Sequence, residues 1–521
     1  AVVPDATVKI TSIERRTTDT VTTNSSGSFS KERLLPGTYE IKVEKQGFKA
    51  AVSTNVSVSV DTQTNADITL QTGQVTEVVT IEADGQVLKT DRADVATTFS
   101  TREVLETPIL DRNFTKLILL TPGTQQQLWN HAASENPQGS TQTIVNGQTF
   151  SGTGYQLDGT DNRDVILGII VINPTFESVG ETKITSSNYD AEFGQAIAGV
   201  ASVQTKSGTN SFRGSVFEYL QRDRFQARNP FSQATPNALT GKFIPDTKRD
   251  QFGGSIGGPI VKDRAFFFFD YQGTRATQGG SKLLTVPTAA ARTGNLSAYG
   301  VPIFNPATGL QYAGNIIPAC TAGQTAAANG CLSTQALAVL NLMPAPTNAN
   351  LVDNFVAAGS ETFNNDVFNV RIDGRLSDNF NLFGRYSQAK FTLTGPTAFG
   401  QGGGPELVSL GGSSNTQNRS LAIGFDYSVT PTTIIDVRFG FFNYKVNVLP
   451  FDFGTSPATT AGIPGLNNDE FSSGLFAGFV GINTATASRD FNFGSGLGVN
   501  RCNCPLDQDE KQYQVVTNLT K

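Results

Sequence analysis

The sequence predicts a mainly β chain with three parts: a small N-terminal β-sandwich, a mixed α and β region, and a series of antiparallel strands of membrane-crossing length. Only 16% of the 521 residues are charged, whereas glycine (52) and phenylalanine (36) are abundant, as in secreted and outer-membrane β proteins. Apolar and polar residues alternate in many short segments, which Gly, Pro and Asn separate. The length exceeds that of one ordinary domain, so we expect several domains.

Charge and hydropathy narrow the classes of function. A formal net charge of −6 offers no basic face for a phosphate backbone, so no nucleic-acid partner is expected. The longest apolar segment, residues 165–172, is much shorter than the roughly 18 residues of a membrane-spanning helix, so a membrane crossing would use strands. Composition also permits a soluble β-rich surface protein. No signal peptide is visible after Ala1, which predicts either a cleaved leader or a fragment.

Residues 1–72 show short alternating runs, such as Tyr39, Ile41 and Val43, and predict the β-sandwich. Pro36-Gly37 predicts a type II turn, because proline fixes φ at the first corner and glycine accepts positive φ at the second. With Asn24–Phe29 and Lys45–Phe48, this pattern resembles the carboxypeptidase regulatory-like domain. The first strand of that family is largely missing here, so we expect a domain that is clipped at its N-terminus. No catalytic residues are evident, and we expect a spacer and folding module rather than a module that binds polysaccharide or a partner.

Residues 73–85 are predicted to be a linker that contains the short β-prone, acidic-flanked segment Thr76–Ala83. Such a segment between two domains could pair edge-on with a strand of another protein.

Residues 86–207 mix helix and strand signals. Arg102–Pro108 and Asn113–Gly123 predict short helices that end at Pro or Pro-Gly, and Thr143–Gln148 and Tyr155–Asn162 predict short strands. A calcium loop that begins at Asp158 would need Gly at position 163 and an acid at position 169. These positions hold Arg and Ile, so no metal site is expected.

The segments Ala191–Gly194 (Ala-Glu-Phe-Gly) and Thr205–Asn210 (Thr-Lys-Ser-Gly-Thr-Asn) carry the most specific pattern in the chain. Residues 172–210 resemble the end of the plug in TonB-dependent outer-membrane receptors of the Oar-like kind. The resemblance implies that residues 86–207 form a plug domain and residues 208–521 the N-terminal part of a β-barrel. Residues 201–205 are less apolar than the corresponding strand of the family, which leaves the exact junction open.

The same resemblance implies energised uptake of an unidentified extracellular ligand across the outer membrane of a Gram-negative bacterium. TonB, with its energising inner-membrane complex, and outer-membrane lipid are the implied partners, and the N-terminal domain would lie in the periplasm. The residues that match the TonB box are Thr76, Glu77, Val78, Val79, Thr80 and Ile81. The ligand contacts expected at the plug apex are Asp158, Asp161, Asn162 and Arg163.

About eight barrel strands can be recognised after Gly208. In one of them Phe368, Val370 and Ile372 alternate with Asn369, Arg371 and Asp373, which predicts a lipid-facing and a lumen-facing side. Long connections (276–361 and 450–509) alternate with short turns (377–378 and 430–431), as in outer-membrane barrels. Because plugged transporters have about 22 strands, we expect the C-terminal part of the barrel to be missing.

Four cysteines lie in two loop-like segments, Cys320 with Cys331 and Cys502 with Cys504. They predict two local disulfides in an oxidising compartment, with free thiols as the alternative, and their spacing does not suit zinc. His131 is the only imidazole, and the glycine-rich residues 253–258 lack the lysine of a phosphate loop. No enzyme, cofactor or metal is therefore expected.

Two alternatives to transport remain open from the sequence. One is a surface adhesin that binds a matrix or another cell through its long loops. The other is a signalling receptor that also transports, which would need an additional N-terminal domain before residue 1.

Overall fold

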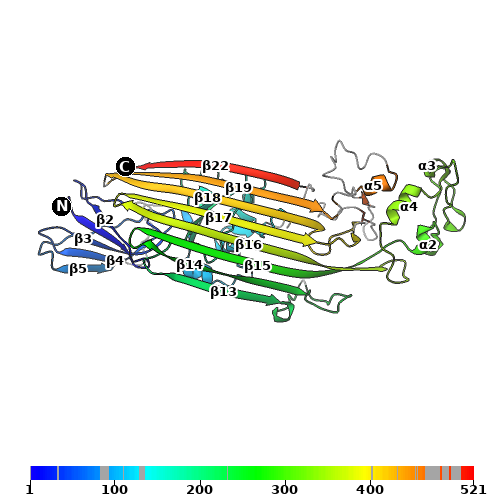
Figure 1. The fold of residues 1–521 in the computed structure, drawn as a ribbon, viewed down its shortest axis with the longest axis horizontal. Coiled ribbons are helices and arrows are strands. Elements are labelled where there is room, and N and C mark those ends of the chain that lie inside the picture. Colours follow the sequence, from blue (N-terminus) through cyan, green and yellow to red (C-terminus); the bar gives the residue numbers. More distant parts are fainter. Residues whose placement is uncertain are drawn as a thin grey trace.

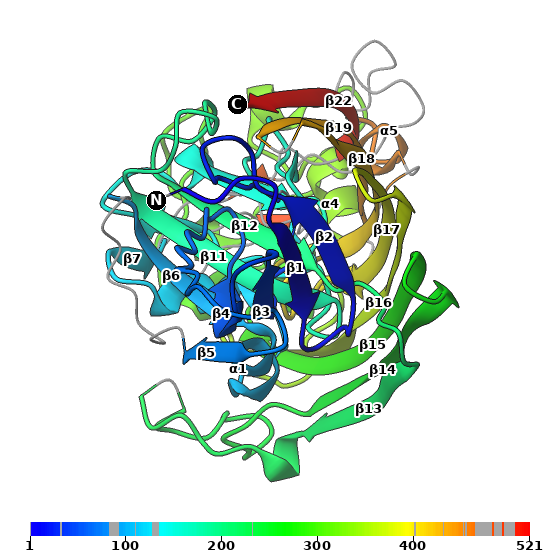
Figure 2. The same ribbon diagram turned by 90° about the vertical axis from the view of Figure 1, so that its left-hand side faces the viewer.

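The structure is a computed structural model that describes residues 2–31, 34–82, 93–109, 111–127, 135–231, 233–400, 403–430, 432–451, 453, 456–463, 482–483, 492–493 and 506–521. Three sheets dominate it. The N-terminal sheet lies at one end of the molecule, and a long outer sheet curves around a shorter inner sheet (Figures 1 and 2). None of the helices in these ranges is both long and apolar enough to cross a membrane.

The N-terminal sheet has five strands in the order β2-β1-β3-β4-β5. Alternation places Val8, Tyr39 and Ile41 on its buried face, which irregular segments cover with side chains such as Phe29 and Ile68. The fifth strand comes from the predicted linker and pairs in parallel with β4, so this segment is part of the sheet. The strands are β1 (Thr7–Ser12), β2 (Thr18–Thr22), β3 (Gly37–Glu44), β4 (Ala50–Val58) and β5 (Val78–Glu82).

The inner sheet has the order β10-β9-β12-β11-β6, with β9 and β12 parallel and the other pairs antiparallel. Helix α1 begins with a capping box, in which Ser100 and Glu103 bond each other's backbone N–H groups. The predicted second helix is a 3₁₀ helix, η1. The elements of this part are β6 (Val95–Ser100), α1 (Thr101–Glu106), η1 (Phe114–Leu120), β7 (Thr124–Gln126), β8 (Thr143–Val145), η2 (Phe150–Gly152), β9 (Thr153–Leu157), β10 (Thr160–Asp161), β11 (Val179–Ser187) and β12 (Gly199–Thr205).

The outer sheet contains eight consecutive antiparallel strands in the order β13-β14-β15-β16-β17-β18-β19-β22, with β13 and β22 at its edges. The number of strands agrees with the roughly eight expected from the sequence, and β16 contains the expected alternating segment 368–373. Their bounds are β13 (Arg213–Arg222), β14 (Thr247–Val261), β15 (Ala265–Leu284), β16 (Phe355–Ser377), β17 (Phe380–Gly395), β18 (Gly412–Thr430), β19 (Thr433–Pro450) and β22 (Leu506–Thr520).

The two faces of the outer sheet differ in polarity. Ile372, Ile423 and Phe439 are exposed on its convex side, whereas Asn369 and Arg371 are buried on its concave side against the inner sheet. A core shared by both sheets includes residues from η1, β9 and β12 and from β16, β17 and β19. The predicted lipid-facing and lumen-facing sides are therefore found in the expected register.

The connections of the outer sheet alternate in length, as predicted. Short connections at 262–264 and 378–379, and the one between Thr430 and Thr433, lie at the end near the N-terminal sheet, and the long connections lie at the other end (Figure 1). One of these spans 285–354 rather than 276–361, because β15 and β16 extend beyond the predicted ends. The remaining elements are η3 (Asp223–Phe225), α2 (Ala289–Arg292), η4 (Ser297–Tyr299), η5 (Ala313–Asn315), α3 (Ala326–Asn329), α4 (Thr334–Leu340), α5 (Pro457–Thr460), β20 (Ile482–Asn483) and β21 (Asn492–Phe493).

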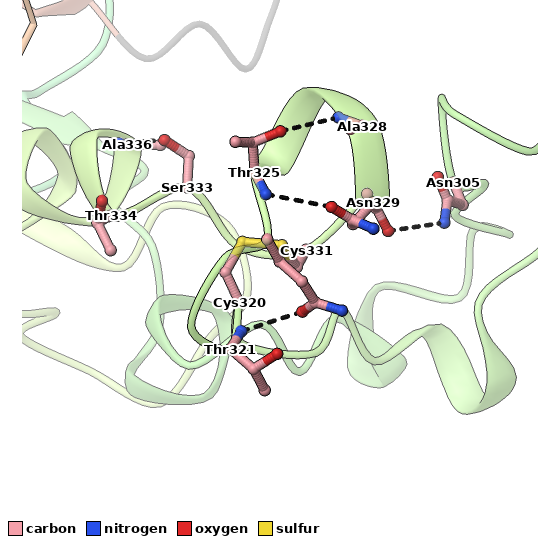
Figure 3. The surroundings of a disulfide bond; sticks show 12 residues. Asn305, Cys320, Thr321, Thr325, Ala328, Asn329, Cys331, Ser333, Thr334 and Ala336 are labelled. Carbon is pink, nitrogen blue, oxygen red and sulfur yellow. Dashed lines mark hydrogen bonds between the residues drawn. A yellow bond between two sulfur atoms is a disulfide. The ribbon is translucent and has the colours of Figure 1, made fainter.

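A disulfide joins Cys320 and Cys331 within the 285–354 connection, next to α3 (Figure 3). The Thr325 side chain caps this helix by accepting a hydrogen bond from the Ala328 N–H. Cys502 and Cys504, and His131, lie outside the described residues.

Candidate functional site

The turn between β9 and β10 points an aspartate at the outer sheet. Asp158 and Gly159 have φ values of 54° and 74°, as in a two-residue hairpin turn that favours Asp-Gly. The Asp158 Oδ1 atom accepts hydrogen bonds from the Thr205 N–H (2.9 Å) and the Gln204 side chain (2.8 Å). The aspartate is thus fixed to the C-terminal end of β12 within the inner sheet.

Two arginines of the outer sheet reach the same carboxylate. Arg371 Nη1 lies 2.8 Å from Asp158 Oδ1, and Arg385 Nε lies 2.9 Å from Oδ2. Arg371 also pairs with Asp373 at 2.8 Å, and the Ser207 hydroxyl donates to Asp373 (2.6 Å). We call Asp158, Thr205, Arg371, Asp373 and Arg385 the Asp158 cluster.

The Asp158 cluster balances two acids against two arginines in a site from which water is largely excluded. At most 3% of the side chains of Asp158, Arg371 and Arg385 is exposed. Arg371 and Arg385 are direct cross-strand neighbours, where like charges repel each other unless a counter-charge lies between them. Asp158 supplies that charge, so an acid from the inner sheet compensates two neighbouring arginines of the outer sheet.

A second contact joins the two sheets near β13. Arg112 pairs with Glu177 (3.3 Å), and its guanidinium lies over the rings of Phe217 and Tyr219 at 4.7 and 4.5 Å. The Ser215 hydroxyl donates to Glu177 at 2.8 Å. This contact fastens the inner sheet to the first outer strand.

The segment Thr76–Ile81 has a different setting, because it is attached by backbone pairing at an exposed edge. Ala50 and Val78 are register partners in the parallel β4–β5 pair, and the Ala50 N–H donates to the Glu77 carbonyl (2.8 Å). Lys49 and Glu77 form an ion pair at 2.7 Å, and 57% of Val78 is exposed. Within the described residues β5 has no strand on its other side.

The N-terminal part also touches the inner sheet directly. The Val60 N–H donates to Glu181 Oε1 (2.8 Å), and Lys183 donates to the Asp61 carbonyl (2.7 Å). Burial raises the pKa of the Glu181 carboxyl to about 7, although the hydrogen bond from Val60 opposes the shift.

Comparison with known proteins identifies the long sheet. The family model of the outer membrane beta barrel domain matches residues 204–521, more than half of the chain. The chain belongs to the outer membrane beta barrel family. A second model, that of the carboxypeptidase regulatory-like domain, matches residues 1–71.

Individual relatives of this outer membrane β-barrel chain are more distant. The TonB-dependent transporter Oar of Myxococcus xanthus is 28% identical over 272 residues, which cover 51% of this chain and 24% of that protein. The chain therefore spans about a quarter of this curated relative. Among solved structures, the outer membrane transporter YddB of Escherichia coli has a TM-score of 0.44 at 11% identity (68% of this chain, 39% of YddB). The siderophore receptor PirA of Acinetobacter baumannii has a TM-score of 0.38 at 14% identity (68% and 40%).

Membership of the outer membrane β-barrel family agrees with the predicted fold class, the predicted outer-membrane location and the prediction that the chain is not an enzyme. Among the described residues, no group of three or more His, Cys, Asp or Glu side chains could hold a metal ion.

The four residues expected to contact a ligand bond other parts of this chain. Asp158 and Asn162 are buried, and Asn162 bonds the backbone of Ile172. The Asp161 backbone and side chain bond Gln514 and Gln512 of β22, and burial raises the pKa of the Asp161 carboxyl. Arg163 is half-buried and donates to the Thr153 carbonyl (3.3 Å). These residues connect the inner sheet to itself and to the outer sheet, and do not form one outward-facing cluster.

Arg371 and Arg385 are the residues that sequence reasoning missed. The sequence pattern places Arg371 only on the polar face of its strand and gives Arg385 no special role. The available signal was their pairing: two lumen-facing arginines on adjacent strands require an acid from another part of the chain.

Proposed function

We propose that this chain is part of a receptor that takes up an extracellular ligand with energy delivered by TonB. The observation that carries the proposal is that Val78–Ile81, within the segment Thr76–Ile81, lies in an edge strand with one side open among the described strands. An edge strand is paired on one side only, so it can leave its sheet and pair with a strand of another protein. In this proposal the N-terminal sheet lies in the periplasm, on the same side as the short turns.

The chain connectivity suggests where force would act. From β5 the chain leads through residues 83–92 to β6, which pairs only with β11 among the described strands. A pull on β5 would first separate the Val60–Glu181 and Lys183–Asp61 contacts and then load β6. An edge strand held on one side is easier to detach than a central strand, so we propose that remodelling starts at β6.

The Asp158 cluster would resist this movement at the opposite part of the inner sheet. It fixes the β9–β10 turn and the end of β12 to the outer sheet, whereas β6 lies at the far edge. We therefore propose that a pull moves the β6 edge while the β9–β12 part remains attached. The four residues first considered as ligand contacts would then belong to the attachment.

Val78→Pro tests the proposal. Proline removes a backbone donor and blocks strand addition, and Val78 is too exposed to contribute much to the core. A photo-crosslinking residue at Thr76 should form an adduct with TonB in cells that carry the otherwise unchanged protein. Val78→Pro should lower the yield of the adduct at least ten-fold at an unchanged outer-membrane level of the protein.

Thr20→Pro is the matched control, because Thr20 is an exposed residue of β2, the strand at the opposite edge of the same sheet. In Thr20→Pro the crosslinked adduct between position 76 and TonB should form as in the unchanged protein. A surface adhesin would show no TonB adduct in any variant, and that outcome would refute energised uptake.

A further inference from the structure

A cavity of about 250 Å³ lies between the inner domain, which is the inner sheet with the helices and loops around it, and the concave face of the outer sheet. Residues 111–113, 137–139 and 173–175 form its inner wall, and strands β14 to β17 form its outer wall. On β16 the cavity is lined by positions 361–367, which lie closer to the long connections than Arg371 does. The cavity is thus situated between the Asp158 cluster and the end with the long loops.

Several polar atoms of this lining have no partner. Gln272 and Asn365 are 8% and 9% exposed, and the oxygen atoms of their side-chain amides form no hydrogen bond with any described residue. The same holds for the amide oxygen of Gln138 and for Nε of Arg249. Buried polar groups are normally satisfied, so a set of unpaired groups around one cavity indicates a polar occupant.

The lining carries as many positive as negative charges. Arg112 is already paired with Glu177, and Asp111 with Lys116 at 2.7 Å. Glu361 accepts hydrogen bonds from the backbone N–H groups of Ser409 and Leu410, both at 3.0 Å. With Arg249, the four charged lining residues sum to zero. The unpaired atoms of the lining are three amide oxygens, one carboxylate oxygen of Asp111 and the Nε groups of Arg112 and Arg249, a mixture of acceptors and donors.

One wall of the cavity is aromatic. Phe363 and Phe391 stack with their ring centroids 6.3 Å apart at an angle of 26°, and Phe363 is only partly buried. A ligand in this cavity would therefore meet an apolar surface on one side and amides on the other. Hydroxyl groups both donate and accept hydrogen bonds, and a sugar ring combines them with an apolar face of C–H groups.

We propose that this cavity binds a neutral sugar unit, which assigns a ligand class to the proposed receptor and in that sense rests on the proposed function. At about 30 Å³ per water molecule, 250 Å³ holds one ring rather than an extended chain. The ligand is accordingly a neutral oligosaccharide, and the sugar unit at its end lies in the cavity. Gln272, Asn365 and Gln138 bond its hydroxyls, and the Phe363–Phe391 pair contacts its C–H face.

Saturation-transfer NMR on the full-length protein tests this assignment. The detergent should be an amine oxide, because detergents with sugar headgroups would compete for the cavity. The probes are neutral trisaccharides (maltotriose, mannotriose, xylotriose and chitotriose), an acidic trisaccharide of galacturonic acid, and trialanine. At least one neutral sugar should bind, and the variant Gln272→Met/Asn365→Leu should weaken its binding at least ten-fold.

The control variant is Gln417→Met, which changes a half-buried glutamine of β18 that does not line the cavity. It should bind the sugar as the unchanged protein does. Three results would overturn the assignment: no neutral sugar binds, the acidic sugar or the peptide binds more tightly, or the Gln272/Asn365 variant keeps its affinity.

The two proposals can fail separately. Sugar binding requires no energy, so Val78→Pro should retain it while losing the TonB adduct. Loss of sugar binding with an intact adduct would reject only the sugar site, and an absent adduct with intact sugar binding would reject only energised uptake.

Discussion

The inner domain is attached in two physically different ways, by the Asp158 cluster on one side and by the N-terminal sheet and β5 on the other. The Asp158 cluster consists of buried charges with direct ion pairs at 2.8 and 2.9 Å. The β5 attachment consists of backbone pairing at an exposed edge, with an ion pair between the partly exposed Lys49 and Glu77. The Asp158 cluster resists separation because separation would leave unpaired charges in a site without water. The hydrogen bonds of β5, in contrast, can be replaced one at a time by hydrogen bonds to water.

This difference suggests a division of labour between the two attachments. A contact that must open and close repeatedly is better made from exposed backbone pairs, whose groups stay solvated in either state. A contact that sets the position of a domain is better made from buried charges, which have no acceptable partner elsewhere. Three predictions test this contrast, from the largest expected effect to the smallest.

Asp158→Asn should produce the largest effect. It leaves Arg371 and Arg385 side by side without their shared counter-charge, and breaking a buried pair costs about 3–5 kcal/mol. We expect a strongly reduced amount of folded protein in the outer membrane and a lower unfolding midpoint in denaturant. Asp378→Asn is the control, because its side chain is 85% exposed in its pair with Arg375. A midpoint as high in Asp158→Asn as in the control would show that the cluster does not hold the two sheets together.

A disulfide across β4 and β5 should affect coupling rather than stability. Val52 and Thr80 are register partners, so Val52→Cys/Thr80→Cys would fix β5 to the N-terminal sheet. If β5 must leave this sheet to meet TonB, the Thr76 adduct should fall at least ten-fold and return after reduction. Each single cysteine variant and the reduced unchanged protein serve as controls, since reduction also affects Cys320–Cys331. A full adduct yield in the oxidised variant would instead mean that TonB adds to the open edge of β5 in place.

The sequence revealed the outer sheet because its signal is local. In β16 the alternation of Phe368, Val370 and Ile372 with polar residues sufficed to locate the strand. The first half of β16 was missed because its outward positions, such as Thr362 and Asn364, are polar like the inward ones. Alternation is only visible where one side meets an apolar environment.

The attachments were not predictable in the same way, because their partners are distant in sequence. Asp158 and Arg371 are 213 residues apart, and an Asp-Gly turn normally indicates an exposed loop. β5 was recognised as β-prone but expected in a free linker, since nothing in its own residues specifies β4 as its neighbour. Only the tertiary structure shows that both segments are already paired.

The smallest expected effect is a pH dependence of the contact between the N-terminal part and β11. Glu181 has its pKa raised to about 7 by burial, compared with an ordinary value of about 4.5 when the contact is open. Between these two pKa values, Glu181 is protonated when the contact is formed and ionised when the contact is broken. The contact is therefore most stable at low pH. Its stability should decrease as pH rises from about 4.5 and should level off above about 7. Asp61 and Lys183 also face this carboxyl, and their opposite charges act on it in opposite directions.

Spin labels at Gln63 and Ala191, both exposed, can measure this contact as a distance distribution. The distribution should broaden between pH 5.5 and pH 8, because burial disfavours the charged form of Glu181 and thus weakens the contact once the carboxyl is deprotonated. Glu181→Gln should remove the dependence, whereas Glu106→Gln, at an exposed carboxylate of α1, should preserve it. A distribution that broadens equally in Glu181→Gln would assign the pH response to another group. The N-terminal contact would then be, like β5, an exposed attachment with no buried charge that controls it.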